Sequence, residues 1–418
     1  MALMRPLLKT SIRPNCYSRA AKVSSSPLAS VRHKSGPYGY TQAKSLVFSE
    51  YGEPKDVLKL HTHSISPDLP ASSLLLRTLA ASINPADVNT IQGTYGVKPT
   101  FSPLIGTTAP SVIPGNEGVF EVLSSASPAS PSTSSSPSAA NIQKGDWVIP
   151  AKTGFGTWRT HALAPASTVL KIEKDGLRPL QAATVAVNPC SAYRMLRAYA
   201  SPPLREGDWV LQNGANSGVG RAAIQLAALW GYRTINVVRA RATPEATAAL
   251  RDELVSLGAT HVVTEEEFLA RGFGEQVREW IRKDGGGSGG GEGVRLGLNC
   301  VGGKSAQAVA KNLGQGATMV TYGGMARQPV ALPTGLLIFK DIRFVGFWLS
   351  RWADGDAVEK ARTVNEILGL MREGKFKDVP VEPVEWNWET EEGALRQAVQ
   401  GTLEGYRSGK GVFVFGDT

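Results

Sequence analysis

Residues 213–220 (NGANSGVG) form the segment of this chain whose composition is best suited to holding a phosphate group. They lie between an apolar run at 208–212, typical of a strand, and an apolar run at 221–230, typical of a helix. Glycines allow a tight strand-to-helix turn and let backbone N–H groups approach a pyrophosphate, while the helix N-terminus adds the positive end of its dipole. Three residues separate Gly214 from Gly218, so the spacing departs from the usual G-x-G-x-x-G, and alone it indicates only a nucleotide-binding turn.

Two arginines follow the second predicted strand, at the position that selects between dinucleotides. Sites for NAD place an Asp or Glu about twenty residues after the glycines, where the carboxylate binds the ribose 2′-hydroxyl. Here Val238 is followed by Arg239, Ala240 and Arg241, and two guanidinium groups can bind a 2′-phosphate. The pattern favours NADPH over NADH, and the alternative is an ordinary solvated strand end.

The elements that must position these residues alternate between β-rich apolar runs and helical runs from 208 to 349. This alternation is typical of a parallel sheet with crossover helices. The predicted strands cover residues 209–212, 234–238, 261–264, 296–300, 318–322 and 342–347. The predicted helices include residues 220–230, 244–257 and 305–313. The predicted fold class is therefore α/β, with a doubly wound Rossmann sheet assigned to residues 188–350 and expected to bind NADPH.

A β-rich region flanks the predicted Rossmann sheet in the sequence. Its predicted strands are short and separated by Gly and Pro: 72–82, 118–123 and 146–149. The C-terminal run 411–415 also has the composition of a strand. Only the β-rich region before the Rossmann sheet readily supplies strands that can pair with it. We therefore expect one discontinuous catalytic domain, made of residues 45–187 and 351–418.

Two low-complexity segments interrupt these regions. Residues 124–140 are mostly Ser, Pro and Ala, and residues 285–293 are nearly all Gly. Such segments bury too little apolar surface to offset the entropy of ordering them, so we expect flexible surface insertions at both places.

The positive charge of the chain is concentrated at its N-terminus. The formal net charge is +9, and the first 49 residues contain eight Lys and Arg but no Asp or Glu; subtracting these eight charges leaves +1. The rest of the chain therefore gives no electrostatic indication of a nucleic-acid partner. An Arg-rich and Ser-rich segment without acids is typical of an organelle transit peptide. We assign residues 1–44 to a mitochondrial transit peptide cleaved near Lys34 or Ser35, and the alternative is a disordered basic tail.

Neither a metal site nor a membrane span is expected. The three cysteines, Cys16, Cys190 and Cys300, form no C-x-x-C pair and no ligand cluster with the five histidines. Zinc bound by Cys and His is therefore not expected, and Cys190 and Cys300 have the apolar surroundings of buried, inert thiols. No apolar run approaches the roughly 20 residues that cross a bilayer.

Several further segments carry a resemblance to a known family. They are, in chain order, 83–95 (INPADVNTIQGTY), 114–118 (PGNEG), 187–196 (VNPCSAYRML), the glycine turn, 298–305 (LNCVGGKS), 319–325 (MVTYGGM) and 346–350 (GFWLS). From residue 45 to the C-terminus the chain resembles the mitochondrial trans-2-enoyl thioester reductases, the enoyl-[acyl-carrier-protein] reductases of the medium-chain dehydrogenase/reductase superfamily. The resemblance implies a GroES-like fold for the β-rich domain.

The resemblance implies that Tyr95 is the catalytic proton donor. An α,β-unsaturated thioester that accepts hydride at Cβ develops negative charge on its oxygen and must then be protonated at Cα. A phenol stays protonated at neutral pH, so it can stabilise this charge and supply or relay the proton. Without the surrounding motif Tyr95 would be taken for an ordinary loop aromatic residue.

The resemblance also implies a set of NADPH contacts. They are Asn188, the turn Asn216, Ser217, Gly218 and Val219, the segment Arg239, Ala240 and Arg241, the strand end Tyr322, Gly323, Gly324 and Met325, the segment Phe347, Trp348 and Leu349, and Lys410. Simpler explanations exist for three of these predicted contacts: a plain turn at Gly323–Gly324, a core position for Trp348 and a solvated charge for Lys410. Relatives commonly keep an acidic residue where this chain has Ala240, so the ribose contacts are expected to differ.

Two other functions remain open, quinone reduction and non-catalytic sensing of NADPH, whereas the chemistry of zinc alcohol dehydrogenases is not expected. Zinc alcohol dehydrogenases share the architecture, but Asn116 stands where their Gly-His-Glu motif places a metal-binding histidine, so no metal is expected. Quinone oxidoreductases are the nearest competitors, because they use the same NADPH domain without the segment around Tyr95. A non-catalytic NADPH sensor is compatible with the glycine turn but leaves that segment unexplained.

The resemblance implies reduction of trans-2-enoyl thioesters, as the last reductive step of a fatty-acid elongation cycle in the mitochondrial matrix. It also implies an apolar channel for the acyl chain, an acyl carrier protein or coenzyme A as the carrier, and a homodimer paired through the cofactor domains. No motif in the sequence encodes the acyl chain length or the choice of carrier.

Overall fold

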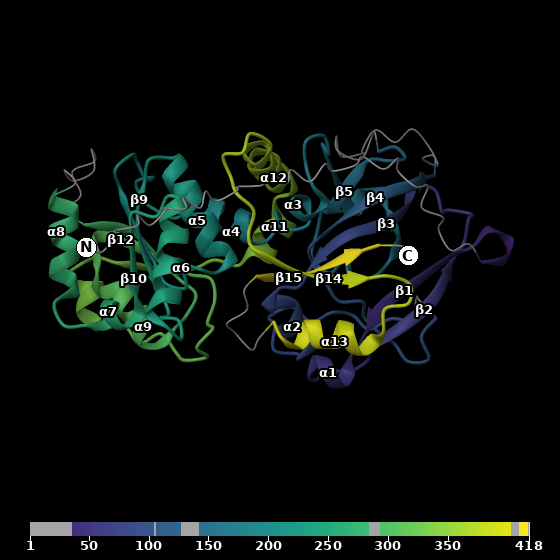
Figure 1. Ribbon diagram of the computed structural model, residues 1–418, viewed down its shortest axis with the longest axis horizontal. Coiled ribbons are helices and arrows are strands. Elements are labelled where there is room, and N and C mark those ends of the chain that lie inside the picture. The colour runs from purple at the N-terminus through teal and green to yellow at the C-terminus, as the bar shows by residue number, and fades with distance from the viewer. Residues whose placement is uncertain (1–35, 104–105, 127–141, 284–292, 403–408, 417) are drawn as a thin grey trace, which may run out of the picture. The chain divides into compact units, whose positions relative to one another are not determined.

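A computed structural model describes residues 36–103, 106–126, 142–283, 293–402, 409–416 and 418 (Figure 1). Most of the predicted transit peptide and most of the two predicted insertions lie outside these residues. Strand β1 (Thr41–Val47) begins before residue 45, where we placed the start of the first domain, and Ser124 and Ser125 belong to strand β4 (Gly118–Ser125) rather than to an insertion. Among the described residues, no helix combines the length and the apolar composition needed to span a membrane.

The predicted Rossmann sheet is present. It contains β8 (Trp209–Gln212), β9 (Arg233–Val238), β10 (His261–Thr264), β11 (Val294–Asn299), β12 (Leu313–Thr321) and β13 (Arg343–Gly346), all parallel, in the order β10-β9-β8-β11-β12-β13. Strands β8 and β11 are neighbours although β9 and β10 lie between them in the sequence. The strand order therefore reverses at this pair, which is where open α/β sheets bind ligands at the carboxyl edge.

The helices of this region begin where the sequence supplies caps. They are α4 (Asn188–Ala198), α5 (Gly218–Leu229), α6 (Pro244–Ser256), α7 (Glu265–Leu269), α8 (Phe273–Lys283), α9 (Gly303–Lys311) and α10 (Thr334–Ile338). The Ser217 side chain accepts a hydrogen bond from Gly220 N at the start of α5, and Thr243 caps α6 in the same way. Pro244 occupies the first turn of α6, as expected from its missing N–H group.

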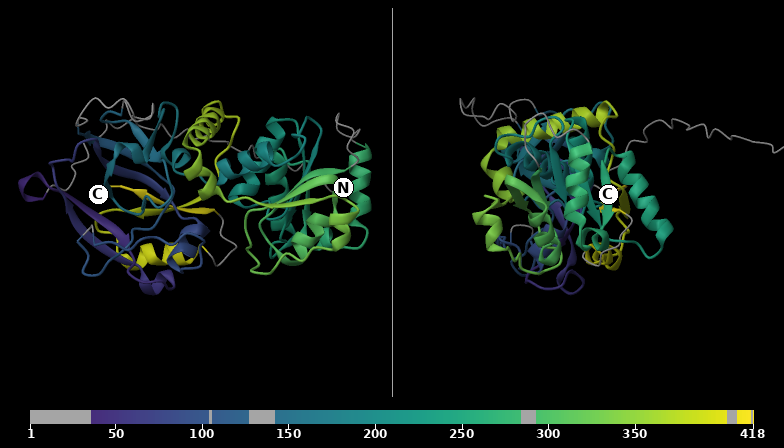
Figure 2. Two further views of the ribbon diagram at one scale, coloured as in Figure 1. Left: turned by 180° about the vertical axis from the view of Figure 1, so that it is seen from behind. Right: turned by 90° about the vertical axis from the view of Figure 1, so that its left-hand side faces the viewer.

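A mixed sheet joins the two ends of the described chain. Its strands are β14 (Val381–Trp386), β15 (Lys410–Phe415), β3 (Ser73–Ser82), β4, β5 (Trp147–Pro150) and β7 (Val169–Ile172) in that order, with β6 (His161–Pro165) paired to β3. Strand β15 runs antiparallel to β3, with Val412 opposite Ser82. Figures 1 and 2 show the yellow C-terminal strands beside the blue strands of the N-terminal half. The predicted pairing of the last strand with the first region is confirmed.

The remaining elements complete both regions. They are the pair β1 and β2 (Lys59–Ile65), the 3-10 turns η1 (Pro37–Gly39) and η2 (Ala166–Thr168), and the helices α1 (Pro54–Val57), α2 (Pro85–Ile91), α3 (Pro179–Ala182), α11 (Leu349–Gly355), α12 (Ala357–Arg372) and α13 (Glu392–Gln400). One buried cluster contains Leu226 of α5, Leu298 of β11, Leu368 of α12 and Val412 of β15. Helix α12 thus shares a core with the Rossmann region, although the sequence placed residues 351–418 with the β-rich region.

Candidate active site

A cleft of about 2160 Å³ brings together residues that follow the strand ends β8, β9, β11, β12 and β13 and residues of the mixed-sheet region. The predicted site residues that line it are Tyr95, Asn188, Asn216, Ser217, Gly218, Val219, Ala240, Arg241, Tyr322, Gly323, Gly324, Met325, Phe347, Trp348, Leu349 and Lys410. Arg239, which directly follows β9, is exposed and does not line the cleft. Of the predicted site residues, Arg239 alone therefore lies outside the cleft lining.

Each glycine of the turn after β8 has a steric reason. Gly214 has φ +61°, and a Cβ added there would lie 2.6 Å from Cys300 Sγ. A Cβ at Gly218 would overlap the side-chain amide of Asn188, and one at Gly220 would overlap the backbone of Ala215. The irregular glycine spacing therefore matches a turn packed on the end of β11 and on the start of α4, and residues 216–219 at the N-terminus of α5 line the cleft.

Polar contacts join the ends of β8 and β11 beneath this turn. Asn213 Nδ2 donates to Asn299 Oδ1 at 2.8 Å, and Cys300 N donates to Asn213 Oδ1 at 2.9 Å. Burial raises the pKa of the Cys300 thiol and holds the pKa of Tyr322 well above its usual value. Both described cysteines lie buried, as predicted. Burial also raises the pKa of Cys190 to about 12, so both side chains are protonated thiols at neutral pH.

The arginine region contains one residue that the sequence analysis missed. Arg241 lines the cleft, and its backbone N–H donates to Thr247 Oγ1 of α6 at 2.8 Å. Arg221, on α5, also lines the cleft; it pairs with both oxygens of Glu253, and its Nε donates to Asn216 O at 3.0 Å. Arg221 thus ties the glycine turn to α6. The sequence did offer one indication of Arg221, because this arginine lies in the first turn of the helix that follows the glycines.

The Tyr95 hydroxyl lies at the centre of a three-residue contact. Trp348 Nε1 donates to the Tyr95 hydroxyl oxygen at 2.9 Å, and the Ser350 Oγ lies 3.0 Å from the same oxygen. The two aromatic rings meet edge to face, with centroids 6.2 Å apart. Trp348 is 41% exposed, so it is not the core residue that the simpler explanation required. Ser350 was missed as a site residue, although it ends the 346–350 motif.

The backbone of Tyr95 is held by helix α2. Tyr95 N donates to Asn89 O at 3.1 Å, immediately after the helix. Helix α2 begins at a capping box in which Asn84 N donates to Asp87 Oδ2 at 2.9 Å. The position of the phenol therefore depends on how α2 is anchored.

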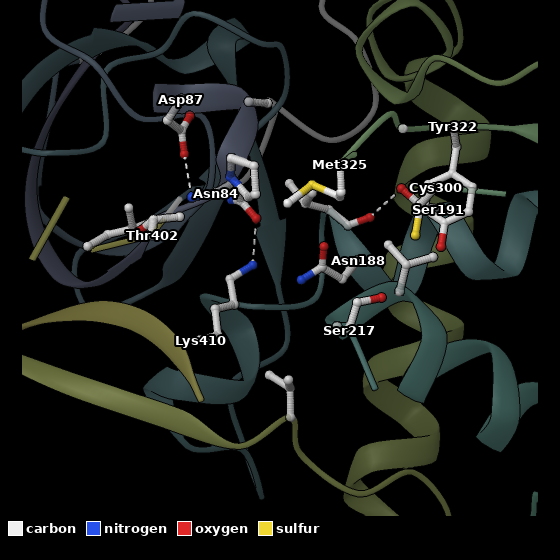
Figure 3. A pocket seen from close by; sticks show the side chains of 18 of the residues that line it. Asn84, Asp87, Asn188, Ser191, Ser217, Cys300, Tyr322, Met325, Thr402 and Lys410 are labelled. Atoms are coloured by element: carbon white, nitrogen blue, oxygen red, sulfur yellow. Dashed lines mark hydrogen bonds between the residues drawn. The ribbon is translucent and has the colours of Figure 1, made fainter. Parts of the chain in front are cut away.

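A buried polar network anchors α2 and the last strand (Figure 3). Lys410 Nζ donates to Asn84 Oδ1 at 2.7 Å and to Glu117 Oε2 at 2.9 Å, and its side chain is only 8% exposed. Lys410 is therefore not a solvated surface charge. Asn116, at the position where zinc enzymes place a histidine, donates to Asp87 Oδ1 at 2.7 Å. Among the described residues no group of three or more His, Cys, Asp or Glu could hold a metal ion.

The Asp87 carboxyl should make stability depend on pH. Burial is the main cause that raises its pKa from 3.8 to about 6. Between these values the folded chain keeps a proton that the unfolded chain has lost, so the free energy of unfolding falls as pH rises from about 4 to 6, by about 3 kcal/mol. Urea unfolding at several pH values should show this slope in the wild type and lose it in Asp87→Asn. The exposed Asp68→Asn is the control, and an equal slope in wild type and Asp87→Asn would contradict the prediction.

The fold and the cleft define a member of the medium-chain dehydrogenase/reductase class. The family described as "Zinc-binding dehydrogenase" matches residues 218–363, although the described part of the chain contains no group of three His, Cys, Asp or Glu that could hold a metal ion. A structure described as a putative NADPH:quinone reductase from Bacillus thuringiensis shares the fold, with a TM-score of 0.68 and 22% identity over 89% of this chain and 99% of that chain.

Closer comparisons give the family. The enoyl-[acyl-carrier-protein] reductase, mitochondrial, of Yarrowia lipolytica is 46% identical over 81% of this chain and 82% of its own length. The structure of the Etr1p/NADP/crotonyl-CoA complex matches with a TM-score of 0.80 and 35% identity, over 89% of this chain and 99% of that chain. The Etr1p/Etr2p heterodimer from Candida tropicalis matches with a TM-score of 0.79 and 35% identity, over the same shares. The chain belongs to the mitochondrial enoyl-[acyl-carrier-protein] reductase family.

Proposed function

We propose that this chain reduces trans-2-enoyl thioesters to saturated acyl thioesters, with NADPH as the reductant. The observation that carries the proposal is the Tyr95 hydroxyl, held by Trp348 and Ser350 in the same cleft as the glycine turn and Arg241. An acid for the substrate and a site for the dinucleotide thus share one space. The Yarrowia lipolytica reductase and the Etr1p/NADP/crotonyl-CoA complex support the same reaction.

The described residues fit NADPH. Residues 216–219 of the turn line the cleft, and Gly218 and Gly220 let this turn pack closely on Asn188 and on the backbone of Ala215, so we propose that the turn receives the pyrophosphate. The 12-residue helix α5 begins at this turn, and we propose that Arg241, which lines the cleft, binds the 2′-phosphate. When bound, NADPH supplies the hydride. Asn188 is a proposed cofactor contact, and residues 322–325 and 347–349 are the proposed contacts on the nicotinamide side.

Hydrogen bonding explains how Tyr95 keeps a proton available. The indole N–H of Trp348 can only donate, so it occupies a lone pair of the phenol oxygen and leaves the phenol proton free to be donated. That proton can point to Ser350 or to the substrate oxygen or Cα. We propose that Tyr95 stabilises the charge that develops on the thioester and supplies or relays the proton to Cα.

Purified protein tested with NADPH against crotonyl-CoA and a small quinone distinguishes the three candidate functions. We expect oxidation of NADPH with crotonyl-CoA and formation of butyryl-CoA. Turnover of the quinone alone would support the quinone oxidoreductase, and NADPH binding without turnover of either would support the sensor.

We propose acyl carrier protein as the physiological carrier and the mitochondrial matrix as the location. The cleft lining includes Lys152 and Arg327, which suit an acidic carrier, and the Yarrowia lipolytica relative is described as mitochondrial. The acid-free N-terminus supports import. A lower KM for the crotonyl carrier protein than for crotonyl-CoA would support this carrier, and the reverse order would argue against it.

We further propose a homodimer and the domain division 45–187 with 351–418 and 188–350. Strand β13 ends the parallel sheet, and the segment before it exposes Leu337, Ile338 and Phe339. The Etr1p/Etr2p heterodimer supports pairing of chains of this family, and we propose that these exposed apolar side chains lie in the interface. Sedimentation velocity should give a dimer that Phe339→Glu weakens; a monomeric wild type would refute the pairing.

A further inference from the structure

We propose that Glu117, which does not line the cleft, is a positioning residue that sets the cofactor contacts Asn188 and Lys410 relative to each other. The inference rests on the proposed function, since it concerns the NADPH site. Glu117 lies just before β4 and is 0% exposed, and both of its carboxylate oxygens are used. Its partners come from three elements that are far apart in the sequence.

The first oxygen fixes the start of helix α4. Val187 N donates to Glu117 Oε1 at 2.8 Å, and Val187 is the N-cap residue of α4. The next residue is Asn188, whose side-chain amide packs directly against Gly218 of the phosphate turn. A shift of Val187 therefore moves the Asn188 amide against the turn that is built to receive the pyrophosphate.

The second oxygen fixes strand β15 and helix α2. Glu117 Oε2 accepts from Lys410 Nζ at 2.9 Å and from Asn84 Nδ2 at 3.0 Å, and Lys410 also donates to Asn84 Oδ1 at 2.7 Å. Lys410 and Asn84 both line the cleft, and Asn84 begins the helix that leads to Tyr95. In Figure 3, Asn84 and Lys410 lie on one side of the pocket and Asn188 and Ser217 on the other.

Only a carboxylate satisfies all of these groups. Val187 N, Asn84 Nδ2 and Lys410 Nζ are all donors to Glu117, so the residue must accept at both of its side-chain ends. A glutamine at this position turns an NH2 group toward at least one donor and removes the charge opposite a buried ammonium. If Glu117 served only as the counter-ion of Lys410, removing both charges together would affect NADPH binding no more than removing Lys410 alone.

The experiment measures the Kd of NADPH by isothermal titration calorimetry for Glu117→Gln, Lys410→Met and the double variant. We expect Glu117→Gln to raise the Kd of NADPH by roughly ten- to 100-fold relative to the wild type. We expect the Kd of the double variant to be about tenfold higher than that of Lys410→Met alone. The double variant removes both charges, so its Tm should recover relative to Glu117→Gln while its Kd does not. Wild-type Kd in Glu117→Gln, or equal Kd in Lys410→Met and the double variant, would overturn the proposal.

The matched control is Glu121→Gln, in strand β4, four residues after Glu117. Glu121 forms a partly buried ion pair with Arg77 at 2.6 Å, and neither residue lines the cleft. Its Kd for NADPH should equal the wild-type value, and an increase like that of Glu117→Gln would show a general effect of the mixed sheet and overturn the proposal. Because binding is measured directly, a wild type that binds NADPH but does not reduce crotonyl-CoA would refute the proposed function without refuting this inference.

Discussion

Replacing Tyr95 with phenylalanine is expected to lower kcat with crotonyl-CoA by about 100-fold or more while leaving the Kd of NADPH unchanged. The loss follows because the variant keeps the ring but removes the hydroxyl that we propose as proton donor, and acid catalysis typically contributes about 10²–10⁴-fold. The ring contact with Trp348 needs no hydroxyl, so the segment should keep its position. Steady-state kinetics and calorimetric titration with NADPH measure the two quantities.

Two variants test whether the phenol itself is responsible. Tyr51→Phe removes a hydroxyl from a tyrosine whose ring packs beside Gly93 of the same segment, but Tyr51 does not line the cleft, so its kcat should stay at the wild-type value. Ser350→Ala removes a partner of the phenol but keeps the phenol, and should lower kcat by less than about tenfold. Full activity in Tyr95→Phe would refute the proposed proton donor.

The Rossmann half of the fold was predictable because its signals are local. Strand β8 is buried at every position and its first three residues are apolar, and the turn after it needs glycines because it packs closely on its neighbours. Strands β2 and β14 were not predicted. Most positions of β2 are not buried, and β14 contains Pro383, which a strand tolerates at the edge of a sheet, where β14 lies.

The site was predictable where one segment carries its own signal, and not where distant residues meet. The motifs suggested both Tyr95 and Trp348, but no spacing in the sequence indicates that an indole N–H, 253 positions away, donates to the phenol. Glu117 gave no signal of its role, because a buried carboxylate is recognised only by the donors around it. Arg239 was predicted to contact the cofactor from its place after β9, yet it is exposed beside the cleft and not in its wall.

This difference between the two arginines gives the last prediction. Arg239→Asp combined with Arg241→Ser should raise the KM for NADPH by about 100-fold or more and change the KM for NADH little, because only NADPH carries the 2′-phosphate. Arg241→Ser alone should account for the larger part, since Arg241 lines the cleft. The matched control is Arg278→Ser with Arg282→Asp, which makes the same charge change on the exposed face of α8. An unchanged KM for NADPH in the Arg239/Arg241 double variant would refute the 2′-phosphate site, whereas an equal rise in the α8 control would assign the effect to net charge.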